Sequence, residues 1–263
     1  MKSQRINNYE VTPLNSKKVY PRTIPEPWAD PISGHDEPFV FVISAKIGSG
    51  KSVMLARLLH DVYPQYFKRV YFCSANILVN DDSGLKEIKD LAYRNQFRLA
   101  QERMYTTFND SIMEEILKDI KECKKEMKEQ EKKDYNEDDY HFLIVADDVS
   151  QSFLPIKSLI VKTILKTRHL KLSWIITTQR YRNISTPIRG QITKFVCFQT
   201  QNKFEVEAIA ESCDMDFEQF KKIFEYCTKN QAHSFLYIDS AKNPPVFYKN
   251  FNEIIITTEE PKK

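Results

Sequence analysis

A run of eight mostly small and polar residues has the composition of a phosphate-binding loop. It reads Ala45-Lys46-Ile47-Gly48-Ser49-Gly50-Lys51-Ser52. The amides of such a loop surround an anion, and the helix that follows adds the positive end of its dipole. Gly48 and Gly50 let the backbone approach phosphate, Lys51 reaches the β- and γ-phosphates, and the Ser52 hydroxyl is a ligand for Mg²⁺. The run therefore predicts a site for a nucleoside triphosphate with Mg²⁺.

Two adjacent carboxylates, Asp147 and Asp148, follow the apolar run at residues 141–146. Carboxylates at the end of a buried strand are costly unless a cation balances them. Asp147 is predicted to hold Mg²⁺, directly or through water, and Asp148 to activate the water that attacks the nucleotide. The alternative is a plain strand-to-loop transition with a capping aspartate.

A third polar position, Gln179, directly follows the apolar run at residues 173–178. At the tip of a strand beside the acidic strand, its amide would contact the γ-phosphate or the attacking water. A surface glutamine in a loop is the other interpretation.

Two arginines are candidates for a finger that stabilises transition-state charge on a neighbouring subunit. Arg168 comes shortly before the strand that ends at Gln179, and Arg189 follows that strand. Each is also compatible with an ordinary surface or packing arginine. The predicted catalytic set is Lys51, Asp148, Gln179 and Arg168.

Short apolar runs of strand-forming residues alternate with helical periodicity, which indicates parallel strands joined by crossovers. The expected strands cover residues 39–44, 69–73, 141–146, 173–178, 194–198, 233–239 and 246–248, and the expected helices residues 51–62, 205–212 and 217–227. The strand at 70–73 stands in the sequence between the phosphate loop and the acidic strand, and an inserted strand there is typical of additional-strand ATPases. The predicted fold is an α/β P-loop NTPase with a mostly parallel central sheet flanked by helices.

The expected domain covers residues 39–250 and includes a charged helical insert at about 110–140. From Lys121 to Asp139 the insert is almost wholly charged, and we expect a solvated helix that supplies no core. Residues 1–38 hold six prolines and predict an extended arm. The arm is either a loosely packed tail or a segment that packs on a neighbouring subunit or on nucleic acid. Residues 251–263 are expected to be a C-terminal tail.

Composition limits the class of protein. A net charge of +3 over 263 residues is too small to indicate a nucleic-acid partner, so any such contact must be local. The five cysteines form no metal-ligand spacing and indicate free thiols in a reducing compartment. We expect neither a secretory leader nor a membrane span.

Together these segments resemble the FtsK–HerA superfamily of hexameric DNA-pumping ATPases. The similarity covers about residues 39–200 and rests on Ala45–Ser52, Leu143–Asp148, Thr167–His169, Trp174–Gln179 and Pro187–Arg189. The paired Asp147-Asp148 is most similar to the genome-packaging ATPases of poxviruses and other large eukaryotic DNA viruses. The resemblance implies ATP as the nucleotide and a homo-oligomeric ring that translocates double-stranded DNA, in contact with capsid or other virion proteins. It also implies a place in the virion or at the viral assembly site in the host cytoplasm.

Other functions stay open from the residues alone. A P-loop kinase or other small-molecule enzyme would share the phosphate loop, and so would a non-hydrolysing structural subunit. A GTPase-like switch is suggested by Asn202-Lys203, although Glu205 stands where such switches have aspartate.

Overall fold

The computed structural model describes residues 2–5, 37–63, 66–77, 83–94, 99–131, 141–153, 155–229 and 231–256. Most of the predicted N-terminal arm lies outside these residues. So do residues 132–140 of the predicted charged insert and residues 257–263 of the predicted tail.

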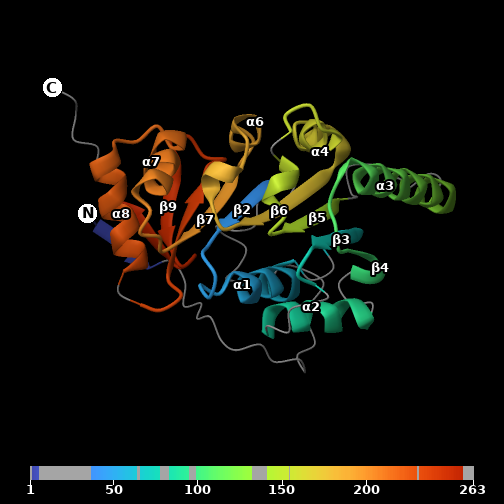
Figure 1. Cartoon of the computed structure of the whole chain (residues 1–263), viewed down its shortest axis with the longest axis horizontal. Helices are drawn as coiled ribbons and strands as arrows, with labels where there is room; N and C mark the ends of the chain where they lie inside the picture. Colours follow the sequence, from blue (N-terminus) through green and yellow to red (C-terminus); the bar gives the residue numbers. More distant parts are fainter. Residues whose placement is uncertain are drawn as a thin grey trace.

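The described strands form one ten-stranded sheet in the order β1-β10-β9-β8-β7-β2-β6-β5-β3-β4. The strands from β7 to β4 in this order are parallel to their neighbours, and those from β8 to β1 add an antiparallel extension. The sheet runs across the molecule in Figure 1. The strands are β1 Lys2–Arg5, β2 Val40–Ser44, β3 Arg69–Ser74, β4 Leu99–Tyr105, β5 Phe142–Asp147, β6 Leu172–Thr178, β7 Lys194–Phe198, β8 Phe235–Asp239, β9 Val246–Lys249 and β10 Glu253–Ile256.

Helices cover both faces of the sheet. One face carries α1, which continues as a π-helical turn over Leu58–Val62, and α2; the other carries α3, α4, α7 and α8 (Figure 1). The helices are α1 Lys51–Arg57, α2 Ser83–Tyr93, α3 Asp110–Glu131, α4 Leu159–Ile164, α5 Thr167–Leu170, α6 Thr186–Arg189, α7 Lys203–Ser212 and α8 Phe217–Thr228. Short 3₁₀ turns cover Ser150–Phe153 and Tyr181–Asn183.

The central strand β2 is buried on both sides, as its unbroken apolar sequence predicts. Val40 and Val42 point into the core beneath α3, α4, α7 and α8, while Phe41 and Ile43 point into the core beneath α1 and α2. All four side chains are at most 1 % exposed. This burial fixes the strand that ends at the phosphate loop.

The strands and helices predicted from periodicity are confirmed, and so is the mostly parallel α/β fold. The position of the inserted strand differs from the prediction. In the sheet, β6 separates β2 from β5, and β3 lies on the outer side of β5. The additional strand is therefore β6, which ends just before Gln179, because order in the sequence does not set order in the sheet.

The prediction that the charged insert supplies no core is wrong for α3. Ile116, Ile120, Cys123 and Met127 are spaced three or four residues apart and are all buried. This spacing places one apolar stripe against the sheet while the charged residues occupy the remaining faces. The high average charge of the segment obscured this apolar spacing in the sequence.

Several described elements were not predicted, among them β1, the short helices α4, α5 and α6, and the three elements that follow. Helix α2 is short, and β4 lies at the edge of the sheet, where Gln101 and Glu102 are exposed and interrupt the apolar pattern. Strand β10 occupies Glu253–Ile256, within the expected tail, and pairs with β9 on one side and β1 on the other.

The five cysteines are free, and burial raises the pKa of each thiol. The pKa reaches about 12 at Cys213 and Cys227. None of the helices described above combines the length and the apolar composition that a membrane span requires.

Candidate functional site

The phosphate loop lies between the carboxyl end of β2 and the first turn of α1. Gly48 and Gly50 have φ angles of 79° and 97°, which favour glycine because it has no Cβ. The Ser49 amide donates to the Lys46 carbonyl at 3.3 Å, and the Met54 amide donates to the Gly50 carbonyl at 2.9 Å. The loop therefore turns tightly and leads directly into the helix, as an anion-binding loop requires.

Two contacts anchor this loop to distant parts of the chain. The Ala45 amide donates to the carbonyl of Thr178, the last residue of β6, at 3.0 Å. On the other side, Nδ1 of His233 lies 3.1 Å from the Ser49 carbonyl oxygen, and it donates when that nitrogen carries the proton.

Close helix packing supports the first turn of α1. A Cβ placed on Gly84, in α2, would lie 2.3 Å from the carbonyl carbon of Ser52 and 2.6 Å from the Val53 nitrogen. Only glycine fits at this contact without a shift of backbone. The α2 helix thus sets the position of the residues that begin α1.

Asp147 ends β5 in a buried environment and is 2 % exposed. Its carboxylate accepts a hydrogen bond from Thr177 Oγ1 at 2.6 Å and another from Ser74 Oγ at 2.8 Å. These hydroxyls belong to the strands on either side, β6 and β3. They orient the carboxylate and offset part of the cost of burying its charge.

Asp148 is the point at which three segments meet. Its Oδ2 lies 3.5 Å from Lys51 Nζ and accepts a hydrogen bond from Gln179 Nε2 at 2.7 Å. The side chains of Lys51 and Asp148 are only 14 % and 18 % exposed, so water screens their attraction weakly. The structure thus brings together three of the four predicted catalytic residues.

The backbone of Asp148 has a φ of 55°, in the left-handed region. Its amide donates to Thr177 Oγ1 at 3.0 Å and lies 3.3 Å from the Thr177 carbonyl oxygen. An aspartate tolerates this region better than most residues, yet the conformation is uncommon and occurs often at functional sites. The turn directs the two adjacent carboxylates to different surroundings.

A hollow of about 460 Å³ opens beside Asp148 and Gln179. Its lining also includes Ala75, after β3, and Arg180, which is exposed. The hollow borders the carboxyl ends of β3, β5 and β6, where ligands bind in open α/β sheets.

The structure places Arg168 away from these residues. It lies in α5, before the amino end of β6, and its Nε is 3.5 Å from Glu37 Oε2. The seven residues of β6 separate it from Gln179, a rise of roughly 20 Å. Arg168 is 74 % exposed and cannot reach the phosphate loop of its own chain.

Arg189 is engaged within its own subunit. Its Nε donates to the Ile184 carbonyl at 2.7 Å, and its guanidinium carbon lies 5.3 Å from the centre of the Tyr181 ring. These contacts hold the segment that joins β6 to β7. Of the two predicted candidates, Arg168 is the one whose side chain is largely exposed.

Sequence reasoning gave no role to Ser74, Thr177, Arg180 or His233. A usable signal existed for Ser74 and Thr177, because polar residues at the carboxyl ends of adjacent strands gather at one edge of a sheet. Arg180 could have been noted as the neighbour of Gln179. No local pattern pointed to His233, which is 184 residues from Ser49.

Comparison with known families gives one match over most of the chain. The family model described as "Poxvirus A32 protein" matches residues 32–239. None of the curated proteins compared with the chain matches it.

Solved structures share the fold. The genome packaging NTPase B204 from Sulfolobus turreted icosahedral virus 2, in complex with AMPPCP, is 17 % identical with a TM-score of 0.55; the match covers 85 % of this chain and 100 % of that one. B204 from Sulfolobus turreted icosahedral virus, described as its DNA-packaging ATPase, is 16 % identical with a TM-score of 0.55, over 82 % of this chain and 98 % of that one.

Proposed function

Because the chain belongs to the poxvirus A32 protein family, which is that of the poxvirus genome-packaging ATPases, we propose that it hydrolyses ATP to move double-stranded DNA into a capsid. The observation that carries the proposal is the meeting of Lys51, Asp148 and Gln179 at one edge of the sheet. A phosphate-binding lysine, an acidic group and an amide are the parts that phosphoryl transfer to water needs. The B204 structures support the proposal, because they share the fold and B204 is described as a DNA-packaging ATPase.

The loop from Ala45 to Ser52 is proposed to hold the phosphates of the nucleotide. Its amides and the start of α1 surround the anion, and Lys51 contacts the β- and γ-phosphates. In the structure Lys51 pairs with Asp148, so binding of a triphosphate would draw the ammonium toward the more highly charged ligand and release the carboxylate. Asp148 would then be free to orient water and accept its proton while Gln179 still donates a hydrogen bond to its Oδ2.

Ser52 and Asp147 fit a place for Mg²⁺. A hydroxyl and a carboxylate are oxygen ligands, and Mg²⁺ usually keeps several waters and uses substrate phosphates as further ligands. Within the residues that the structure describes, no group of three His, Cys, Asp or Glu side chains could hold a metal. An ion that arrives with the nucleotide does not need such a group. When bound, it neutralises charge on the phosphates.

A ring of identical subunits, of which a hexamer is the form we favour, completes the proposed site. Arg168 is exposed at the amino edge of the sheet and out of reach of its own phosphate loop. If neighbouring subunits pack head to tail, this edge faces the adjacent nucleotide, and a guanidinium there suits bidentate contact with phosphate. Capsid or other virion proteins are proposed as further partners. The proposed location of the protein is the virion or the viral assembly site in the host cytoplasm. Five free thiols, four of them buried, are compatible with a reducing compartment.

The GTPase-like alternative finds no support at Asn202. That side chain caps α7 by accepting a hydrogen bond from the Phe204 amide at 3.1 Å, and Lys203 lies 3.3 Å from Glu207. A P-loop kinase shares the phosphate loop, but its turnover is not expected to change when duplex DNA is added.

The test is ATP turnover with and without long duplex DNA, with GTP in parallel and Lys51→Ala as the inactive control. A motor is expected to turn over faster with DNA. Turnover that long duplex DNA leaves unchanged would contradict the proposal, and turnover of GTP alone would favour a switch.

A further inference from the structure

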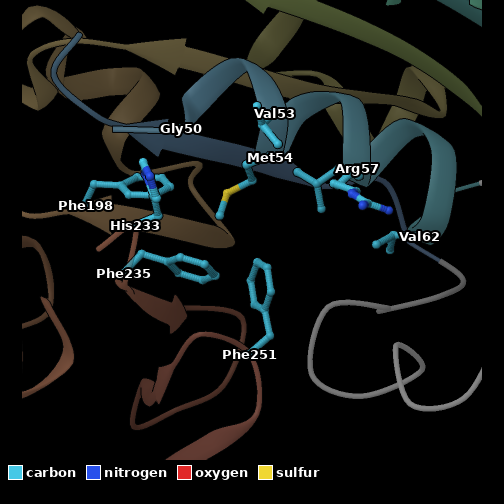
Figure 2. A pocket seen from close by; sticks show the side chains of 10 residues that line it. Gly50, Val53, Met54, Arg57, Val62, Phe198, His233, Phe235 and Phe251 are labelled. Atoms are coloured by element: carbon cyan, nitrogen blue, oxygen red, sulfur yellow. The ribbon is translucent and has the colours of Figure 1, made fainter. Parts of the chain in front are cut away.

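An apolar cavity of about 170 Å³ lies directly beside the phosphate loop. One wall is formed by Gly50, which precedes α1, and by a face of α1 that holds Val53, Met54 and Arg57; it continues over Leu58 and Val62 of the π-helical turn. The opposite wall holds three aromatic rings, those of Phe198, Phe235 and Phe251. Figure 2 shows Met54 pointing toward the space between Phe235 and Phe251.

The aromatic wall is held in place before any ligand binds. The ring centres of Phe198 and Phe235 are 5.4 Å apart, and those of Phe235 and Phe251 are 4.7 Å apart in an edge-to-face arrangement. All three side chains are at most 4 % exposed. Such a preformed wall of aromatic faces suits a flat ring and loses little freedom when one binds.

The lining of the cavity includes a residue of the phosphate loop. Gly50 belongs to both, and a Cβ on Gly50 would lie 3.3 Å from His233 Nδ1. His233 is exposed and contacts the Ser49 carbonyl. A ligand whose phosphates occupy the loop therefore has an apolar cavity within reach of its non-phosphate end.

We propose that this cavity holds the nucleobase of the triphosphate, so that α1 binds the phosphates with its first turn and the base with its side. The inference rests on the proposed function, because it assumes that the loop binds a nucleotide. An apolar cavity of about 150 Å³ holds one benzene ring, so this one has room for a flat heterocycle.

The walls also determine how the base is recognised. The polar side chains are Arg57 and His233, and both are engaged: Arg57 donates to Asp61 at 2.6 Å, and His233 contacts Ser49. The other side chains are apolar. The base is thus held by burial and stacking rather than by hydrogen bonds to its edge, and this gives ATP and GTP similar affinities.

The experiment compares dissociation constants for Mg-ATP, Mg-GTP and Mg-tripolyphosphate by calorimetry. Met54→Trp fills the cavity from α1, and Met215→Trp is a matched control at a partly buried methionine that does not line it. Stacking of a base on aromatic side chains is worth about 1–3 kcal/mol, so Met54→Trp is expected to weaken ATP about 10- to 100-fold. Tripolyphosphate, which lacks a base, is expected to bind Met54→Trp and wild type equally, and this also shows that the phosphate loop is folded.

Three results would overturn the inference. Wild-type ATP affinity in Met54→Trp means that the cavity is not the base site, although nucleotide binding then stands. A preference for ATP over GTP of more than about tenfold means that hydrogen bonds read the base. Equal losses for ATP and tripolyphosphate in Met54→Trp mean that the substitution acts on the phosphate loop. A wild type that binds none of the three ligands would contradict the proposed function itself.

Discussion

Replacement of Gly84 by alanine tests whether α2 positions the phosphate loop. The added Cβ would lie 2.3 Å from the carbonyl carbon of Ser52, about 1 Å short of the 3.4 Å at which ordinary contact begins. The obstacle is backbone, so no side chain can rotate away. Helices α1 and α2 must therefore move apart, and the displaced residues of α1 are Ser52 and Val53, next to the phosphate loop.

The expected magnitude follows from two opposing effects. Overpacking a core contact costs about 1–3 kcal/mol, while alanine gains up to about 1 kcal/mol over glycine in a helix. The net loss is about 1–2 kcal/mol, which lowers the Tm by roughly 2–8 °C for a domain of this size. A displacement of about 1 Å at catalytic groups can cost about 100-fold in rate, so kcat/KM for ATP should fall by about 10- to 100-fold.

The matched control is Gly190→Ala. Gly190 has a φ of −67°, and a Cβ there would meet nothing closer than 3.7 Å. This substitution should leave kcat/KM unchanged and raise stability by at most about 1 kcal/mol. Thermal unfolding and steady-state ATP turnover on both variants check the reasoning. A Gly84→Ala protein with the Tm and the turnover of wild type would refute it.

Four further substitutions separate the proposed roles. Lys51→Ala should abolish ATP hydrolysis and leave the Tm nearly unchanged. Turnover at the wild-type rate in this variant would contradict the assignment of the loop as the phosphate-binding site. Asp148→Asn should keep nucleotide binding but slow hydrolysis by about 10²–10⁴-fold. Asp147→Asn should instead weaken Mg²⁺-dependent nucleotide binding. If nucleotide titrations and turnover give the opposite pattern, Asp147 is the base and Asp148 the magnesium ligand. Arg168→Ala should bind ATP but not hydrolyse it, and mixing it with Lys51→Ala should restore part of the turnover; mixed rings that stay inactive would exclude action in trans.

The phosphate loop was predictable because its requirements are local. Gly50, Lys51 and Ser52 stand at positions that each need a particular residue type, and the flanking strand and helix are visible in the apolar pattern. The convergence of Asp148 with Gln179 was partly predictable, since both follow buried strands. The contact between them requires β5 and β6 to be neighbours, and a single sequence does not give the order of strands.

Other features depend on contacts between distant segments. The core role of α3 rests on Cys123 and Met127, whose spacing matters more than the charge around them. The sequence placed Arg168 in the predicted catalytic set with Arg189 as a second candidate, and the three-dimensional contacts of Arg189 distinguish the two. The cavity beside α1 is built by Phe198, Phe235 and Phe251, which no local motif connects.

Movement along DNA is the central claim, and displacement of a third strand from a long duplex measures it directly. A triplex-forming oligonucleotide is annealed near one end, and its release is followed with ATP, without nucleotide, and with Asp148→Asn as the hydrolysis-deficient control. The proposed motor releases the strand only in wild type and only with ATP, at a time that grows with the length of duplex to be crossed. ATP turnover by wild type without any release of the strand would contradict the account.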